Sequence, residues 1–105
     1  MQAGGLLHVA GQAGIDAAGE VAGATFGEQA RQAFANVDAV LRAGGSRPEL
    51  VVSTTFLVSD VAHFAELNEL FAAFFPSEPP TRMVMQVPLP RGLLISIGCI
   101  AVVGD

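Results

Sequence analysis

The chain has 105 residues, of which 51% are hydrophobic and 14% charged, and its formal net charge is −5. This length predicts a single domain spanning residues 1–105. The charged fraction lies well below the roughly 25% that is usual for globular domains. Two explanations stay open: a dense core within one chain, or apolar surface that is buried against other copies of the chain. We favour the second explanation.

The charge balance and the single cysteine exclude several classes of function. All basic residues are arginines, so no lysine can form a Schiff base. An acidic chain without lysine is also unsuited to nucleic acids, because phosphate contacts need clustered Lys and Arg. Cys99 has no partner for an intramolecular disulfide, which is typical of a reducing compartment. No segment resembles a signal peptide or reaches the roughly 18 apolar residues of a membrane span, so we expect a cytoplasmic protein without a membrane partner.

The N-terminal half predicts two short strands and an amphipathic helix. Residues 6–12 and 20–22 predict the strands, each next to a glycine-containing turn. Thr25 and Glu28 have the spacing of a capping box, in which a hydroxyl and a carboxylate each satisfy the other's free amide. The apolar stripe behind them predicts a helix that ends at the glycine pair 44–45.

The C-terminal half predicts strands at residues 50–59, 81–87 and 93–103. Between the first two, Asp60 predicts the N-cap of a second helix, which ends at Pro76. Apolar residues at helical spacing predict the core side of this helix: Phe64, Leu67, Phe71 and Phe74. The order β-β-α-β-α-β-β favours one mixed sheet with both helices packed on one face, and the other face then needs cover from other subunits.

Six blocks of the sequence carry a family resemblance. In chain order they are Val9-Ala10-Gly11-Gln12, Glu28 to Arg42, Val51 to Phe64, Asn68-Glu69 with Phe74-Phe75, Pro80-Thr81-Arg82, and Leu89 to Ala101. Together they resemble the signatures of the RidA/YjgF family, also called the endoribonuclease L-PSP-like family, whose usual forms include V-S-G-Q, E-Q-x-R-Q and P-A-R. Six blocks in the right order are a specific signal, although any one alone would be weak.

The resemblance implies an α/β (α+β) fold of the chorismate-mutase-like (YjgF) type, assembled as a homotrimer with three clefts between neighbouring subunits. It also implies the activity of a 2-iminobutanoate/2-iminopropanoate-type deaminase, which hydrolyses reactive 2-imino acids to 2-keto acids and ammonia. No metal and no organic cofactor is implied. The expected partners are two further copies of the chain and a small carboxylate-bearing metabolite.

Arg82 is the principal binding residue that the resemblance implies. A guanidinium can hold a carboxylate through two parallel, charge-assisted hydrogen bonds that fix the plane of the substrate. The backbone after this arginine lines the family's cleft, so Val84 is a further candidate. Ala10 and Gly11 in the first signature, and Gly98 in the last, complete the predicted substrate-binding set.

Other positions depart from the family pattern. Ala10 replaces the serine of V-S-G-Q, while Ser96 and Gly98 replace the two glutamates of the closing E-I-E. The chain has no tyrosine, although relatives carry one before the first signature. Losing the placed carboxylate removes acid–base catalysis that typically contributes about 10²–10⁴-fold. Gly98 also leaves room for a ligand larger than the family's small imino acids.

Strand alternation suggests which groups replace the lost ones. His8 shares a face with Ala10, and Ser96 shares a face with Gly98. His8 and Ser96 are therefore the catalytic candidates, His8 because an imidazole titrates near neutral pH. The alternative for His8 is a structural histidine that is satisfied by a backbone carbonyl. Cys99 lies on the opposite face, toward the helices, and we expect it to be a small core residue.

Two functions stay open at this point. The first is a RidA-like deaminase in which Arg82 binds the substrate carboxylate. The second is a non-catalytic trimeric protein of the same family, which binds a metabolite in the same cleft or acts as a scaffold. A retained Arg82 is compatible with both, whereas the loss of the family's serine, glutamate and tyrosine favours the second. The acidic charge and the absence of lysine give no support to a ribonuclease.

Overall fold

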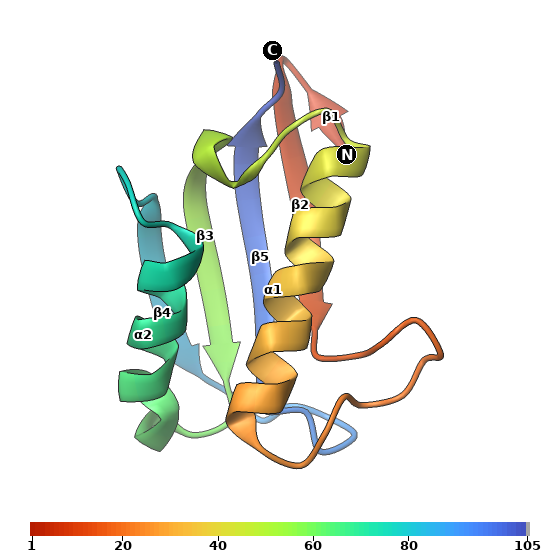
Figure 1. The fold of residues 1–105 in the computed structure, drawn as a ribbon, viewed down its shortest axis with the longest axis vertical. Coiled ribbons are helices and arrows are strands. Elements are labelled where there is room, and N and C mark those ends of the chain that lie inside the picture. The colour runs from red at the N-terminus through yellow and green to blue at the C-terminus, as the bar shows by residue number, and fades with distance from the viewer. Residues whose placement is uncertain (105) are drawn as a thin grey trace.

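A five-stranded mixed sheet in the order β1-β2-β5-β3-β4 forms the centre of the computed structural model, which describes residues 1–104 (Figure 1). The strands are β1 (Gln2–Ala3), β2 (Leu6–Ala13), β3 (Val51–Val58), β4 (Thr81–Gln86) and β5 (Ile95–Val102). β3 and β4 run parallel, and every other neighbouring pair is antiparallel. The mixed sheet that the sequence predicts is therefore confirmed.

Both helices lie on the same face of this sheet, as predicted (Figure 1). They are α1 (Phe26–Ala43) and α2 (Phe64–Phe74), and two short 3-10 turns, η1 (Pro48–Leu50) and η2 (Val61–His63), precede β3 and α2. Within residues 1–104, neither helix is long and apolar enough to cross a membrane.

The ends of α1 follow from local chemistry. The backbone N–H of Glu28 donates to Thr25 Oγ1 and the N–H of Thr25 donates to Glu28 Oε1, both at 3.2 Å, so the predicted capping box is confirmed. The Thr25 hydroxyl, which also donates to Glu28 Oε1 at 2.9 Å, and the Thr25 N–H both lower the pKa of the Glu28 carboxyl group. At the other end Gly45 adopts φ +82°, which lets the Ser46 N–H reach back to the carbonyl of Leu41 at 2.8 Å. Glycine at this position is the usual way to stop a helix.

The second predicted strand is wrong. Residues 20–22 form only an isolated bridge, between Val21 and Ile15. Asp16 Oδ1 accepts hydrogen bonds from the amides of Ala18 and Glu20, so the loop satisfies its amides locally. The strand that precedes α1 together with β2 is instead β1, which the sequence analysis did not predict. It pairs with β2 across a turn formed by Gly4 and Gly5, both of which have positive φ.

Asp60 caps the turn before α2 rather than α2 itself. Its Oδ1 accepts from the N–H of Ala62 at 2.9 Å, and this closes η2. The α-helix then begins at Phe64, one turn later than the cap predicts. The predicted N-cap is thus confirmed for the turn that leads into the helix.

The core fills the space between the helices and the sheet. Side chains alternate along β3 and β5, so every second one is buried beneath the helices. The largest fully buried apolar side chains are Phe56, Leu41, Leu67, Ile95, Ile97, Val37 and Val58. Burying each of them contributes about 1.5–3 kcal/mol relative to exposure to water. This packing fixes the position of β4, the strand at the edge that carries Arg82.

Among residues 1–104, no helix covers the other face of the sheet. Strand register places the alternate residues of β2, β5, β3 and β4 on this open face, and none of them is Asp, Glu or Arg. Met83, Met85 and Val102 are exposed there by 57%, 41% and 40%. Apolar side chains gathered on one face are typical of a surface that meets a partner.

Candidate active site

Arg82 lies on the edge strand β4 and points toward the helices. Its register partner in the parallel pair is Thr54, which is buried beneath the helical layer. The guanidinium carbon lies 4.8 Å from the ring centre of Phe71 and 5.3 Å from that of Phe64. Its NH1 also donates a 2.7 Å hydrogen bond to Asn68 Oδ1. One face of α2 therefore holds this guanidinium in place.

Phe64 corrects a prediction. The sequence predicts both Phe64 and Phe71 as core residues; Phe71 does pack against the core, whereas Phe64 is 42% exposed. Both rings lie beneath the guanidinium of Arg82. Phe64, Asn68 and Phe71 follow at i, i+4 and i+7, which places them on one stripe of α2. This spacing in the sequence indicates that the three residues share one side of α2. Only the packing of β4 against α2 shows that this side contacts Arg82.

The charge of Arg82 has no acidic partner among residues 1–104. The only ion pair in that part of the chain joins Arg42 to Asp38. Asn68 Oδ1 accepts one hydrogen bond from NH1 of Arg82. No other N–H group of Arg82 has an acceptor among those residues. A guanidinium with donors to spare and an exposed position can bind a carboxylate through two parallel hydrogen bonds.

Val84 lies on the same side of β4 as Arg82. Its register partner is the buried Phe56, and Val84 is half-buried against the core. The side chain thus contacts the core, which leaves the backbone of the edge strand to face outward.

The remaining predicted residues lie on the open face. Pairing of β2 with β5 shifts between Val9 and Gln12, so Ala10 and Gly11 together stand opposite Gly98. This is a β-bulge, in which two residues of one strand oppose one residue of the other. The register thus brings Ala10 and Gly11 beside Gly98, whereas the sequence alone predicted only which residues share a face within each strand.

Small side chains leave space around the bulge. A Cβ atom added to Gly98 would lie 3.5 Å from the carbonyl oxygen of Val9 and 4.0 Å from the nitrogen of Gly11, which is ordinary contact. A Cβ atom added to Gly11 would lie 2.6 Å from Ser96 Oγ, so the Ser96 hydroxyl lies directly beside Gly11. His8 is exposed on the same face and pairs with Ile100. Neither Gly98 nor Gly11 has a positive φ.

Within one chain the two halves of the predicted site do not meet. Arg82 faces the helices, whereas Gly98 and the bulge lie on the open face, and β3 runs between β4 and β5. Neighbouring strands are about 4.8 Å apart, so this arrangement separates the two halves by about 10 Å across the sheet. A single chain does not bring Arg82 and Gly98 together.

Cys99 lies beneath the helices, as predicted. It is 6% exposed, and burial raises the pKa of its thiol to about 11. A thiol with this pKa is protonated at neutral pH and is a poor nucleophile. Among residues 1–104, no group of three or more His, Cys, Asp or Glu side chains is placed to hold a metal ion.

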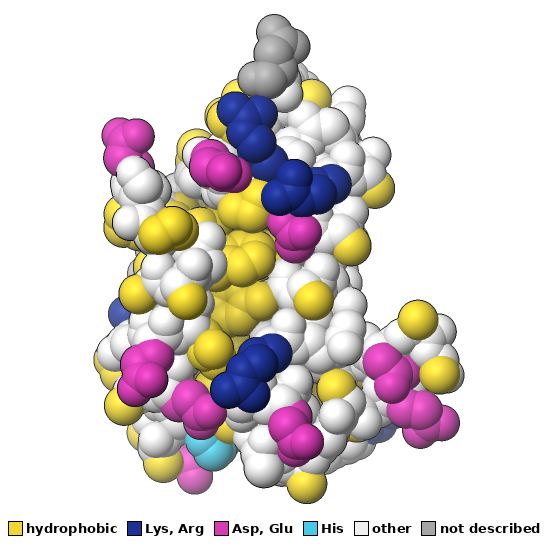
Figure 2. Space-filling view, in the orientation of Figure 1, with side chains coloured by type: hydrophobic (Ala, Val, Ile, Leu, Met, Phe, Trp, Pro, Cys, Tyr) yellow, Lys and Arg dark blue, Asp and Glu magenta, His cyan; other side chains and the backbone are white. Residues whose placement is uncertain are grey.

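Two hollows of the surface lie elsewhere, between α1 and α2. Figure 2 shows hydrophobic side chains gathered there, with basic side chains at both ends. One hollow has a volume of about 250 Å³ and the next about 270 Å³, and Ala73 and Phe74 line both. None of the predicted site residues lines either hollow.

Comparison with known proteins identifies the family. Residues 1–103 match the family described as endoribonuclease L-PSP. The chain belongs to this family, which is the RidA/YjgF family. The rat 2-iminobutanoate/2-iminopropanoate deaminase is 37% identical over 100 residues, which cover 93% of this chain and 73% of the rat protein. The human protein of the same name is 35% identical over 100 residues, with the same coverage.

Solved structures of the RidA/YjgF family have the same fold. RidA from a Psychrobacter species superimposes with a TM-score of 0.91 at 35% identity, covering 98% of this chain and 85% of that one. A protein of the conserved Rid family from Yersinia pestis superimposes with a TM-score of 0.93 at 30% identity, covering 97% and 83% of the two chains. The α+β fold expected from the resemblance is confirmed.

Proposed function

We propose that this chain hydrolyses small 2-imino acids to 2-keto acids and ammonia, with Arg82 binding the substrate carboxylate. The names of relatives at 35–37% identity suggest the reaction class. The observation that carries the role of Arg82 is its environment. Phe64, Phe71 and Asn68 fix the guanidinium, and no acidic side chain among residues 1–104 neutralises it.

We further propose that the working form is a homotrimer with the substrate in a cleft between subunits. The open sheet face carries no Asp, Glu or Arg on its strands, and its methionines are exposed in the single chain. Covering this face with a neighbouring subunit removes apolar surface from water. The same contact would bring Arg82 of one subunit toward the bulge of another, which a single chain cannot do.

In the proposed reaction, water adds to the carbon of the C=N bond and a proton passes to the nitrogen. The resulting amino alcohol then collapses, the C–N bond breaks, and ammonia and the 2-keto acid leave. Arg82 holds the carboxylate, while Ala10, Gly11, Val84 and Gly98 line the cleft. His8 and Ser96 are the groups proposed to move protons, because both lie on the open face near Gly98.

One observation favours a second candidate function. No carboxylate lies on the strands of the open face, so the group that would position water there is absent from them. A trimer that binds a carboxylate-bearing metabolite without converting it would need only Arg82 and the surrounding cleft. Both candidates share the binding residue and differ in turnover.

A coupled assay separates the two candidates. An amino-acid oxidase generates 2-imino acids, and the gain in 2-keto acid on adding the chain is followed for wild type and Arg82→Ala. We expect wild type to accelerate 2-keto acid formation. In Arg82→Ala this acceleration should be smaller by about 10²-fold or more, because two charge-assisted hydrogen bonds to the substrate are lost. Arg47→Ala, which removes an arginine that none of these contacts involves, should keep the activity.

Two other outcomes would change the proposal. No gain with a folded trimer that still binds a 2-keto acid through Arg82 would favour the binding protein. Equal activity in wild type and Arg82→Ala would contradict the role of Arg82 in either candidate.

A further inference from the structure

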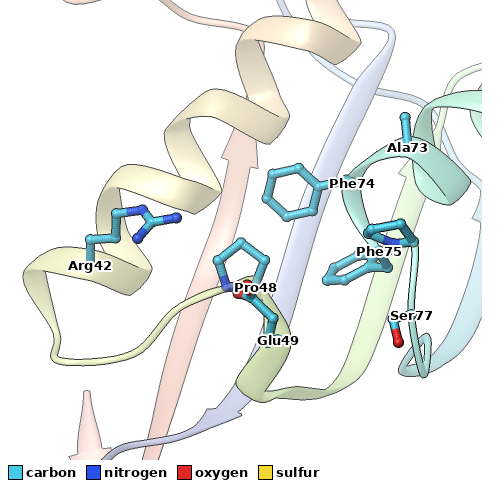
Figure 3. A pocket seen from close by; sticks show the side chains of 8 residues that line it. Arg42, Pro48, Glu49, Ala73, Phe74, Phe75 and Ser77 are labelled. Carbon is cyan, nitrogen blue, oxygen red and sulfur yellow. The ribbon is translucent and has the colours of Figure 1, made fainter. Parts of the chain in front are cut away.

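The hollow of about 250 Å³ between α1 and α2 combines both signs of charge with apolar walls (Figure 3). It lies where the C-terminal ends of the two helices approach η1. The residues that line it are Arg42, Pro48, Glu49, Ala73, Phe74, Phe75, Pro76 and Ser77. None of them belongs to the cleft proposed above.

Arg42 provides a positive charge at this hollow. Its Nε donates to Asp38 at 3.0 and 3.1 Å, and no residue among 1–104 accepts from its terminal nitrogens. Figure 3 shows the Arg42 side chain extending from α1 toward Phe74. Asp38, chiefly through these hydrogen bonds, and Glu49, through its charge, raise the pKa of Arg42. The guanidinium therefore keeps its charge and has two nitrogens available for a carboxylate.

Glu49 provides a negative charge at the hollow, and the end of α2 provides partial negative charge. Glu49 is exposed on η1 and forms no ion pair among residues 1–104. Pro76 has no amide N–H, and within residues 1–104 no backbone amide beyond the helix donates to the carbonyls of Ala73 or Phe74. The C-terminus of a helix carries partial negative charge and favours a cation. An ammonium group placed here would meet a carboxylate and free carbonyl oxygens.

Apolar side chains line the hollow beside Arg42 and Glu49. Phe74 and Phe75 pack edge to face, with ring centres 4.9 Å apart, and Pro48 lies opposite them. The neighbouring hollow extends this apolar surface along the helices, over Phe34 and Leu70. A volume of about 250 Å³ is below the roughly 300–1,000 Å³ of sites for drug-sized ligands, so the occupant is smaller than a drug.

We propose that this hollow binds an apolar α-amino acid as its zwitterion. Arg42 binds the carboxylate, Glu49 and the end of α2 bind the ammonium group, and Phe74 and Phe75 contact the side chain. This inference does not depend on the proposed hydrolysis, because it uses neither Arg82 nor the open face.

Titration of the full chain with L-leucine and L-phenylalanine, followed by amide NMR shifts, tests this site. We expect saturable amide shifts at Glu49, at Ala73 to Phe75 and at Ser77. Arg42→Gln and Glu49→Gln should each weaken binding about tenfold or more, because each removes one charge-assisted contact. Arg47→Gln and Arg82→Ala should bind as wild type does. Surface ion pairs add at most about 1 kcal/mol to stability, so both Gln variants should fold.

Analogues test each end of the ligand. 4-Methylpentanoate lacks the ammonium group, 3-methylbutylamine lacks the carboxylate, and glycine lacks the side chain, so each should bind about tenfold or more weakly than L-leucine. Equal binding of 4-methylpentanoate or 3-methylbutylamine would overturn the zwitterion assignment, and equal binding of glycine would overturn the contact with the apolar side chain. The site itself is refuted if no saturable shift occurs up to the solubility limit, or if the shifts disappear in Arg82→Ala.

Discussion

Arg82 is held by aromatic and amide groups rather than by an acid. A guanidinium over an aromatic face gains about 0.5–2 kcal/mol, depending on its exposure to water. An acidic partner at this position would compete with a substrate carboxylate, whereas the rings of Phe64 and Phe71 and the amide of Asn68 do not. Each contact therefore orients the side chain and leaves its charge available.

Gly98 offers a test by gain of function. The space around it accepts a Cβ atom at ordinary contact distance, so Gly98→Glu should fold and place a carboxylate next to the bulge. We expect the hydrolysis rate to rise about tenfold or more, as part of the 10²–10⁴-fold that acid–base catalysis contributes. Gly98→Gln is the matched control, because it has the same shape without the acid. An equal change in both variants would show that the carboxylate has no role there.

Cys99 should make the folded chain less stable at alkaline pH. Burial raises its folded pKa to about 11, so the folded state holds the thiol proton more tightly than the unfolded chain does. The resulting stability is present below the unfolded pKa of about 8.5 and is lost as pH rises toward the folded value. The chain has neither lysine nor tyrosine, so no other side chain titrates in this window. Urea unfolding from pH 8.5 to 11 should show a falling free energy in wild type and no such fall in Cys99→Ala; the same slope in both would contradict this assignment.

At the scale of elements, two side chains of α1 hold the loops at one end of the sheet. Gln29 is 1% exposed; its Nε2 donates to the carbonyls of Gly23 and Gly92, and its Oε1 accepts from the N–H of Leu94. Asn36 Nδ2 donates to the carbonyl oxygens of two further residues, Ala13 and Ile15. These residues of the first-helix signature therefore serve the fold.

Gln29→Leu should be strongly destabilising. The change keeps the apolar stem but leaves one buried N–H and two carbonyls without their partner, at about 1–3 kcal/mol per buried group. Because the loops can relax toward water, we expect a loss of about 2–4 kcal/mol in urea unfolding. Gln32→Leu, which loses one bond to a half-buried Asn36, should cost less than about 1 kcal/mol. Similar losses in both variants would show that Gln29 does not hold the loops.

Features that depend on near neighbours in the chain were predictable. The capping box at Thr25 and the glycine stop after α1 each involve residues within a few positions of each other. β1 was missed because its strand character comes from pairing with β2. Arg82 was found from its motif, but its contact with Asn68 requires the packing of β4 against α2, which periodicity does not reveal. Alternation likewise gives the faces of one strand but not that Arg82 and Gly98 face opposite ways.

For the whole molecule, the open face predicts self-association. Met83 lies on the open face of the edge strand β4 and is 57% exposed, so Met83→Glu should change the stability of the single chain little. In a trimer it would bury an unpaired charge between subunits, and we therefore expect it to disrupt the trimer. Val61, which is 58% exposed on η2, offers a control of equal exposure away from the sheet. Light scattering should show a trimer for wild type and Val61→Glu and smaller species for Met83→Glu. A monomeric wild type would remove the proposed cleft.

Complementation between two inactive variants tests most directly whether one site combines Arg82 of one subunit with the open face of another. Arg82→Ala removes the carboxylate contact, and Gly98→Phe fills the space beside the bulge; each alone should hydrolyse 2-imino acids poorly. When the two chains are unfolded together and refolded as mixed trimers, some clefts receive an intact Arg82 and an intact Gly98, so we predict that activity returns. Mixed trimers that stay as inactive as their parents, or a fully active Gly98→Phe parent, would contradict a site shared between subunits.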